Sequence, residues 1–239
     1  MSIPFITAEE AASYIKNGDN VGFSGFTASG TPKVVTVALA KRAKELHEKG
    51  EPFKINLYTG ASTNDHVDGE LSRANAVNLR IPYQGHKDAR NAINSGEIAY
   101  VDAHLSHLSQ DLRYGFYGDI DVAIIEATEM SPNGEVILGA GLGMTPTVAR
   151  LAKKVIIEYS SYYHTSFRGF HDNYIPLDPP HRREIPIYKP SDRIGSTVLK
   201  IDPAKIIGIV PSNASESIHA FTAADEVTQR IGDNVCQFL

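Results

Sequence analysis

Residues 21–33, with the sequence VGFSGFTASGTPK, decide the fold of this chain. The apolar first residues predict a buried strand, and Gly25 and Gly30 allow the turn after it to take positive φ or to approach a ligand closely. Pro32 suits the first turn of a helix, with Thr31 as the expected N-cap. A strand, a glycine-rich turn and a helix in this order predict an α/β unit whose free N–H groups face an anion or a carbonyl oxygen.

The same pattern also occurs where a chain only changes direction, so spacing alone leaves a purely structural role open. The nucleotide-binding fingerprints do not fit. Gly22, Gly25 and Gly30 lack the dinucleotide spacing, and no Gly-Lys-Ser/Thr follows them. A nucleotide-phosphate cradle is therefore excluded as the interpretation of this turn.

Composition narrows the class of protein. With 239 residues the chain forms one large domain or two small ones. Its formal charge of −5 argues against nucleic-acid binding, which needs a basic excess. A single cysteine excludes an intrachain disulfide and suits a reducing compartment. No segment reaches the ~18 apolar residues of a membrane span, and no signal peptide is visible. We expect a cytoplasmic protein that does not use the membrane.

Strands and helices alternate along most of the chain. Strands are expected at residues 21–24, 54–59, 76–81, 98–102, 121–127, 154–159, 197–201 and 206–210. Helical patterns occupy about 33–49, 86–95, 105–115 and 145–153. Continuous apolar runs are typical of a parallel sheet covered on both faces, whereas the turn at 131–134 indicates an antiparallel part. The predicted fold class is α/β, with a mostly parallel sheet sandwiched by helices.

The last third of the chain departs from this alternation. Residues 161–196 are proline-rich and irregular, as expected of a functional segment or an interface arm. An amphipathic helix follows, with Thr222 as its expected N-cap. It reaches Leu239 without a glycine or a basic last turn, which we expect of a longer chain. The predicted division is an α/β domain over 1–221 and a helix over 222–239 leading toward a second domain.

Small polar residues follow four predicted strands, at Gly25–Gly30, 59–63, 82–84 and 139–147. A doubly wound sheet would bring these segments to one rim. Backbone N–H groups and Ser/Thr hydroxyls there suit recognition of a carbonyl or carboxylate. Four unrelated tight turns are the alternative.

Other candidate groups give weaker signals. Glu126 and Glu158 end predicted strands, either as nucleophiles or bases or as solvated or helix-capping carboxylates. His104 and His107 have no further ligands in a zinc pattern, so no metal is predicted. Cys236 lies beside the apolar stripe of the last helix, where a small buried hydrophobe is expected instead of a nucleophile.

A basic run covers residues 179–195 inside an acidic chain. It is either a solvated arm or subunit contact, or an anion clamp. For the clamp, Arg193 is the best candidate because a guanidinium pairs bidentately with carboxylates and phosphates.

Several of these segments together resemble a known family. Residues 25–33 resemble the Gly-Phe-Thr-x-x-Gly-x-Pro-Lys signature of the acetyl-CoA hydrolase/transferase family, the class I CoA-transferases. Residues 58–62 are similar to its next strand and turn, and 80–84 to its Arg-x-Pro-Tyr-Gln segment. Residues 171–176 and 193–195 resemble its succinate/propionate/acetate CoA-transferase branch.

The resemblance also shows departures. Members of the family are about twice as long, and this chain is similar to their N-terminal half. The glutamate that forms their covalent intermediate lies in the C-terminal half, after a Gly-x-Gly-Asn-type turn without a counterpart here. Gly143-Met144 stands where Gly-Asn is common, and Ser160 where the strand usually ends in asparagine. We therefore assign no catalytic residue within this chain.

The resemblance implies transfer of CoA from a short-chain acyl-CoA to acetate, propionate or succinate, or acetyl-CoA hydrolysis, through a glutamyl-CoA thioester. CoA is then a substrate, and neither a cofactor nor a metal is expected. The implied substrate-binding residues are Gly25, Phe26, Thr27, Gly30, Ser62, Tyr83, Gln84 and Arg193.

The implied partners are acyl-CoA, a small carboxylate and the missing C-terminal catalytic domain. Without that domain an exposed apolar surface would favour a homo-oligomer. Two alternatives remain from the residues alone. One is a sugar-phosphate isomerase-like α/β domain, and the other is a non-catalytic binding or assembly subunit.

Overall fold

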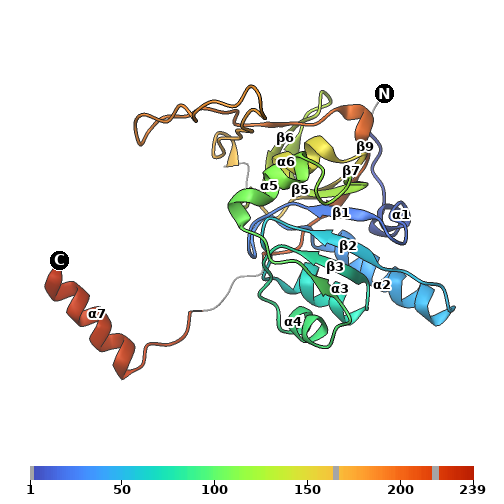
Figure 1. Ribbon diagram of the computed structural model, residues 1–239, viewed down its shortest axis with the longest axis horizontal. Coiled ribbons are helices and arrows are strands. Elements are labelled where there is room, and N and C mark those ends of the chain that lie inside the picture. Colours follow the sequence, from blue (N-terminus) through green and yellow to red (C-terminus); the bar gives the residue numbers. More distant parts are fainter. Residues whose placement is uncertain (1–2, 164–166, 217–220) are drawn as a thin grey trace.

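A nine-stranded, mostly parallel sheet forms the centre of the computed structural model, which describes residues 3–163, 167–216 and 221–239. Its parallel part has the order β4-β3-β2-β1-β5-β7-β9 (Figure 1). The strands are β1 Asn20–Phe23, β2 Ile55–Tyr58, β3 Val77–Ile81, β4 Ala99–Tyr100, β5 Val122–Met130, β6 Glu135–Leu138, β7 Lys154–Ser160, β8 Leu199–Lys200 and β9 Ile206–Ser212.

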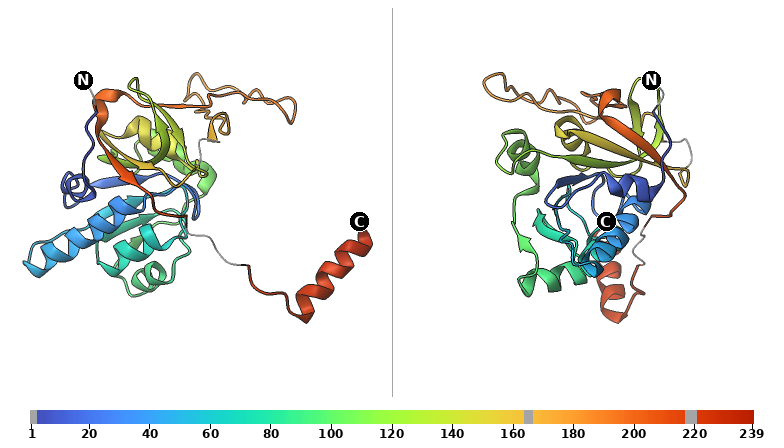
Figure 2. Two further views of the ribbon diagram at one scale, coloured as in Figure 1. Left: turned by 180° about the vertical axis from the view of Figure 1, so that it is seen from behind. Right: turned by 90° about the vertical axis from the view of Figure 1, so that its right-hand side faces the viewer.

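Helices cover both faces of this sheet (Figures 1 and 2). The helices of the described residues, of which α7 lies apart from the sheet, are α1 Ala8–Ser13, α2 Val34–Glu48, the π-helix η1 Asp65–Gly69, α3 Glu70–Arg73, α4 Lys87–Asn94, α5 Leu105–Arg113, α6 Thr145–Leu151, the 3-10 helix η3 Pro203–Lys205 and α7 Glu226–Phe238. Val122 and Ile124 pack in the core on the α1–α4 side, whereas Ala123 and Ile125 pack on the α5–α6 side. Alternate side chains of β5 thus fill two cores, so its apolar run is continuous.

The predicted antiparallel part is present. β6 pairs antiparallel with the end of β5, through Ala127↔Leu138 and Met130↔Val136, and β8 pairs antiparallel with β6. The turn at 131–134 predicted this hairpin, but residues 135–138 were not among the predicted strands. Because β6 runs back along β5, which lies beside β1, the segment that follows β6 reaches the end of β1.

The predicted strands and helices are confirmed with shifts of a few residues at their ends, apart from the last helix. Two helices that follow β2, η1 and α3, were not among the elements predicted from the sequence. The expected N-cap of the last helix was wrong. α7 begins after Asp225, whose side chain accepts a hydrogen bond from the N–H of Thr228, while the Thr228 hydroxyl accepts one from Asp225 N.

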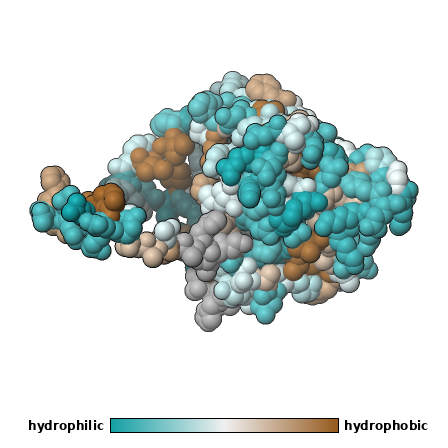
Figure 3. Space-filling view, turned by 90° about the horizontal axis from the view of Figure 1, so that it is seen from below, coloured by the Kyte–Doolittle hydropathy of each residue, from teal (hydrophilic) through white to brown (hydrophobic). Residues whose placement is uncertain are grey.

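The arm and the last helix lie outside the layered body (Figures 1 and 2). Residues 176–191 are almost all exposed and contain neither strand nor helix, as expected of an arm. α7 shows its apolar side chains to solvent, with Phe238 91% exposed (Figure 3, left). Cys236 is exposed as well, so its expected burial was wrong, because α7 packs against nothing that the structure describes. Within the described residues, no helix has both the length and the apolar character for crossing a bilayer.

Candidate functional site

Three of the predicted segments join at the carboxyl ends of β1, β2 and β3. Thr27 N donates to the carbonyl of Ala61 at 3.0 Å, and Thr63 N donates to the carbonyl of Thr27 at 3.3 Å. Ser62 N in turn donates to the carbonyl of Tyr83 at 3.3 Å. These bonds extend the strand order beyond the sheet itself, so the turns after the three strands form one continuous rim.

Ser62 is at the centre of this rim. Its side chain is buried, and its Oγ accepts a hydrogen bond from Asn64 Nδ2 at 3.1 Å, which leaves its O–H as a donor. On its other side the carbonyl of Ser62 accepts from Gly85 N at 3.0 Å, and Ser62 pairs with Gln84. The buried Gln84 Oε1 has no hydrogen-bond partner among the described residues. Tyr83 and Phe26 are 54% and 42% exposed and stand at the edge of the rim.

The loop after β6 packs against the turn that follows β1 and completes the rim. Gly25 pairs with Gly143, and a Cβ on Gly143 would lie 2.0 Å from the Gly25 carbonyl. Gly25 and Gly30 take φ values of +97° and +70°, so the prediction of positive φ is confirmed. Glycines are therefore required on both loops, because only residues without a side chain let the two backbones touch.

A small cavity adjoins these loops. Its volume is about 170 Å³, and it lies between the rim and the first turns of α5. Its walls come from Phe26, Gly60, Leu105, Leu108, Ser109, Gly143 and Met144. The walls are largely apolar, with Ser109 contributing a hydroxyl. This cavity could not be predicted from the sequence, because no local pattern indicates which loop α5 faces.

The N-terminus of α2 is occupied by an internal carboxylate. Glu158 Oε1 accepts from Lys33 N at 2.7 Å, and Glu158 Oε2 accepts from Val34 N and Val35 N at 3.1 and 3.0 Å. Burial raises the pKa of Glu158, and these three N–H donors act in the opposite direction. The helix-capping interpretation of Glu158 is confirmed.

Two expectations for this junction were wrong. Thr31 is not the N-cap of α2, since Lys33 occupies that position and the buried Thr31 Oγ1 has no partner among the described residues. The first N–H groups of α2 are also not free for a ligand. Glu158, supplied by β7, already binds them, and only the topology of the sheet reveals that contact.

A buried ion pair packs against the glycine-rich turn. Lys33 is 1% exposed, and its Nζ donates to the Glu126 carboxylate and, at 3.0 Å, to the carbonyl of Thr31. Burial raises the pKa of Glu126 to about 8, which Lys33 partly offsets, while Glu216 and Glu158 raise it further. Glu126 is thus neither solvated nor a helix cap.

A second buried pair supports the rim under Tyr83. Arg80 Nε donates to Asp68 Oδ1 at 2.9 Å, and both side chains are almost completely buried. Arg80 Nη2 donates to the carbonyl of Tyr83 at 3.2 Å, and Nη1 donates to the carbonyl of Ile81. The sequence analysis quoted this arginine only as part of a motif, because its partner belongs to the unpredicted η1.

The predicted anion clamp lies in the arm. Arg193 Nη1 donates to the carbonyl groups of Gly169 and His171, at 2.8 and 3.2 Å, and its residue is exposed. His171 Nε2 is hydrogen-bonded to the carbonyl of Gly139, which ties this part of the arm to the loop after β6. The structure therefore joins Thr27, Ser62, Tyr83 and Gln84, whereas Arg193 holds the fold of the arm.

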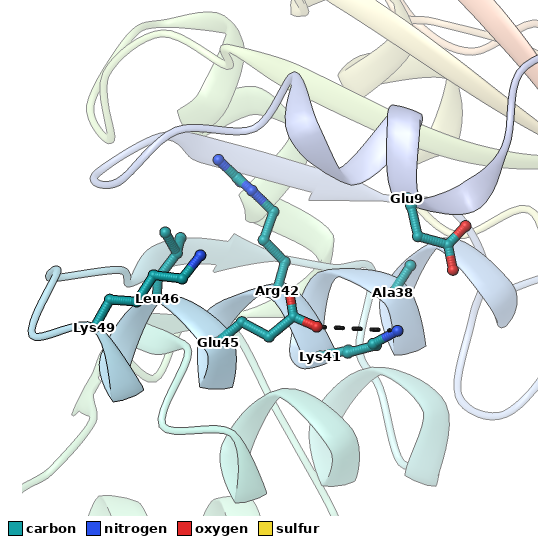
Figure 4. Close-up of a pocket in the computed structure, with 7 residues that line it drawn as sticks. All are labelled: Glu9, Ala38, Lys41, Arg42, Glu45, Leu46 and Lys49. Atoms are coloured by element: carbon teal, nitrogen blue, oxygen red, sulfur yellow. Dashed lines mark ion pairs between the residues drawn. The ribbon is translucent and has the colours of Figure 1, made fainter.

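A second hollow lies on the outer face of α2, and Figure 4 shows its residues. Its volume is about 250 Å³, and charged side chains such as Glu9, Lys41 and Glu45 surround it. Lys41 and Glu45 form an ion pair across one helical turn, with 3.9 Å between Nζ and Oε1. This hollow lies along the later turns of α2, away from the rim. His104 and His107 are exposed on α5, and no described group of His, Cys, Asp and Glu is arranged to hold a metal ion.

Comparison with known proteins agrees with this architecture. The chain is 44% identical over 234 residues to a propanoyl-CoA:succinate CoA transferase of Escherichia coli, covering 98% of this chain and 48% of that protein. It is 39% identical over 231 residues to an acetyl-CoA hydrolase of Schizosaccharomyces pombe, covering 94% and 44%. The chain thus spans about half the length of the curated relatives it matches.

Solved structures show the same fold at lower identity. RipA from Yersinia pestis aligns with a TM-score of 0.63 and 20% identity, covering 93% of this chain and 45% of that one. Glutaconate CoA-transferase from Acidaminococcus fermentans aligns with a TM-score of 0.55 and 13% identity, covering 87% and 75%.

The family model of the acetyl-CoA hydrolase/transferase N-terminal domain matches residues 3–211. With most of its length matched by this model and with curated relatives above 30% identity, the chain belongs to the acetyl-CoA hydrolase/transferase family.

Proposed function

We propose that this chain forms the acyl- and carboxylate-facing wall of an enzyme that moves CoA between a short-chain acyl-CoA and a small carboxylate. The observation that carries the proposal is the rim itself. The turns after β1, β2 and β3 meet there, with the buried hydroxyl of Ser62 as a hydrogen-bond donor, next to a small apolar cavity. Donors placed around an apolar space suit a thioester or carboxylate whose acyl group is apolar.

The size of the cavity supports a short acyl group. About 170 Å³ equals the volume of roughly five to six liquid water molecules, which suits a chain of a few carbons. Phe26 from the β1 turn and Leu105 and Leu108 from α5 would contact the acyl methyl and methylene groups. Ser62, with Gln84 beside it, would donate hydrogen bonds to the carboxylate or thioester oxygen.

In the chemistry we propose, a glutamate carboxylate attacks the acyl-CoA thioester and expels CoA thiolate, leaving an acyl-glutamyl anhydride. The thiolate then attacks the glutamyl carbonyl, releasing the first carboxylate and leaving a glutamyl-CoA thioester. The acceptor carboxylate reverses these steps. Each tetrahedral intermediate carries an oxyanion, so a donor such as the Ser62 hydroxyl would lower its energy.

We further propose that the attacking glutamate belongs to a second domain, joined or separate. Glu158 is fully engaged at the N-terminus of α2 and Glu126 lies under the turn against Lys33, so neither faces the cavity described above. We place the α/β domain at 1–221 and the helical segment leading toward that domain at 222–239. A homo-oligomer and a cytoplasmic location, which suits the single cysteine, are parts of the same proposal.

An exchange assay tests the proposal. The enzyme that contains this chain is mixed with propionyl-CoA and either acetate or succinate, and the CoA esters are separated by chromatography. We expect acetyl-CoA or succinyl-CoA to form as propionyl-CoA disappears. Hydrolysis to free CoA alone would assign the hydrolase activity of the family instead. The absence of both reactions, together with binding of a sugar phosphate, would contradict the proposal.

A further inference from the structure

Two side chains that take no part in the proposed CoA-transfer chemistry hold the glycine-rich turn through hydrogen bonds to its carbonyl groups. Lys33 Nζ donates to the carbonyl of Thr31 at 3.0 Å, and Ser24 Oγ donates to the carbonyl of Gly30 at 2.8 Å. Two successive carbonyl groups are therefore drawn to the same side of the chain. Because each peptide unit is planar, fixing these carbonyls fixes the peptide planes at the end of the turn.

Both of these side chains are in turn bound by one residue. The Glu126 carboxylate accepts from Lys33 Nζ, and Glu126 N donates to Ser24 Oγ at 2.8 Å. Glu126 lies in β5, an inner strand of the sheet, where it pairs with Glu158 of β7. It thus connects the turn to the sheet through its backbone and through its side chain.

The N–H of Gly30 is directed at a carboxylate. Glu216 Oε1 accepts from Gly30 N at 2.8 Å, and Glu216 Oε2 lies 3.4 Å from Lys33 Nζ. This contact shows that the Gly30 N–H, which belongs to the Ser29–Gly30 peptide, points at a carboxylate oxygen with the Lys33 ammonium beside it. Lys33 is therefore shared between two carboxylates, and the charge of one affects its hold on the other.

Glu126 has a raised pKa, which its surroundings explain. The charged groups that act on it are Lys33 from α2, Glu158 from β7 and Glu216 from the segment after β9. Its other oxygen, Oε1, has no hydrogen-bond partner among the described residues and would lie 2.8 Å from a Cβ on Gly139. Burial raises its pKa to about 8, so its charge changes within a range that is easily measured.

We propose that Glu126 is a positioning residue that, acting through Ser24 and Lys33, holds the Gly30–Thr31 and Thr31–Pro32 peptide units and thereby sets the position of Gly30, whose N–H group binds the Glu216 carboxylate here and would bind a substrate carboxylate or an oxyanion in the enzyme. The geometry of the positioning unit stands on the contacts above. Its use in catalysis rests on the proposed function.

A pH titration of the Gly30 amide tests the inference directly. Labelling with carbonyl-13C serine and 15N glycine selects three amides in this sequence, those of Gly25, Gly30 and Gly96, because only these glycines follow serine. Gly96 follows α4 and serves as the internal control. Between pH 6 and 9.5 we expect the Gly30 resonance to move in one step centred near pH 8, while Gly96 stays in place.

Variants assign this step to a residue. Glu126→Gln should abolish it, whereas Glu129→Gln, on the same strand but paired with the exposed Arg168, should keep it. Glu216→Gln should change the position of the Gly30 resonance and still keep the step. A wild-type Gly30 amide without a step, or a step that disappears in Glu216→Gln, would overturn the inference even if Glu126→Gln failed to fold.

The kinetic consequence separates this inference from the proposed function. In the enzyme that transfers CoA, Glu126→Gln should lower kcat at least tenfold at pH 9, where Glu126 is ionised, change the KM for acyl-CoA less than twofold and remove the change of kcat near pH 8. A wild-type enzyme without transfer activity would contradict the proposed function and leave the amide titration standing. Normal kcat and an unchanged pH profile in Glu126→Gln would overturn the positioning role.

Discussion

Gly30 packs directly against the backbone of Gly141. A Cβ on Gly30 would lie 2.6 Å from the Gly141 carbonyl oxygen, and a Cβ on Gly141 would lie 2.1 Å from the Ser29 carbonyl oxygen. The turn after β1 and the loop after β6 therefore meet without side chains between them. Their contact fixes how close the two loops come at the rim.

Gly30→Ala should consequently destabilise the protein more than its backbone angle alone explains. Gly50 has a similar φ of +75°, against +70° for Gly30, but no atom lies within 4 Å of its Cβ position. Gly50→Ala should cost about 1 kcal/mol, and Gly30→Ala should cost about 1–3 kcal/mol more because the loops must separate. Urea unfolding of both variants gives the difference. Equal losses would contradict the close packing of the two loops.

The unfolding free energy should depend on pH through Glu126. Its pKa is about 8 in the folded protein and close to the ordinary glutamate value of 4.5 in the unfolded chain. The folded state therefore binds the proton more tightly, so the stability that this proton provides is complete below about pH 4.5 and is lost as the pH rises through 8. The slope can reach ~1.4 kcal/mol per pH unit.

The test is urea unfolding at pH 5, 6.5, 8 and 9. Wild type should lose stability across this range relative to Glu126→Gln, which has no such proton. Glu129 has a lowered pKa because of Arg168, so Glu129→Gln should leave the wild-type slope unchanged above pH 5. Parallel curves for wild type and Glu126→Gln would show that the Glu126 carboxyl is ionised throughout.

Ser62→Ala removes the hydroxyl that we place against the substrate carboxylate. Loss of one hydrogen bond should raise the activation free energy by about 1–3 kcal/mol and so lower kcat/KM for acetate roughly 5- to 150-fold. The kcat/KM for the CoA ester should change little. Thr63→Val, which removes the neighbouring hydroxyl at nearly constant shape, is the control. If Ser62→Ala lowers only the melting temperature, the hydroxyl serves Asn64 and not the substrate.

Ser109→Leu should fill the cavity beside the rim. We expect kcat/KM for propionyl-CoA to fall relative to acetyl-CoA by about tenfold, because loss of space for one methylene is worth about 1–3 kcal/mol. Ser106→Leu places the same side chain at an exposed position of α5 and should leave the ratio unchanged. Identical ratios in both variants would place the acyl group elsewhere.

The sequence predicted the parts of this protein that depend on local pattern. The apolar run of β5 and the glycines after β1 predicted the sheet and the positive φ values, because both are properties of neighbouring residues. The resemblance added the rim residues Ser62, Tyr83 and Gln84. Contacts between distant segments could not be predicted. Glu158 reaches the N-terminus of α2 only because β7 lies beside β5 in the sheet.

The buried ion pairs show the same limit. Lys33 and Glu126 are 93 residues apart in the sequence, and a lysine after Pro32 predicts by itself only a helical first turn. Arg80 and Asp68 are closer in the sequence, but Asp68 lies in a π-helix that no periodic pattern announced. Long-range electrostatics therefore had to come from the structure.

Borohydride trapping of the covalent intermediate identifies the residue that carries CoA. The 239-residue chain, alone and together with the second half of a family enzyme, is incubated with acyl-CoA and labelled acetate, reduced with borohydride and digested. Our account predicts no reduced glutamate within residues 1–239 in either sample, and a modified glutamate in the second half together with transfer of CoA to acetate. A reduced glutamate at Glu126, Glu158 or any other position of this chain would contradict the account.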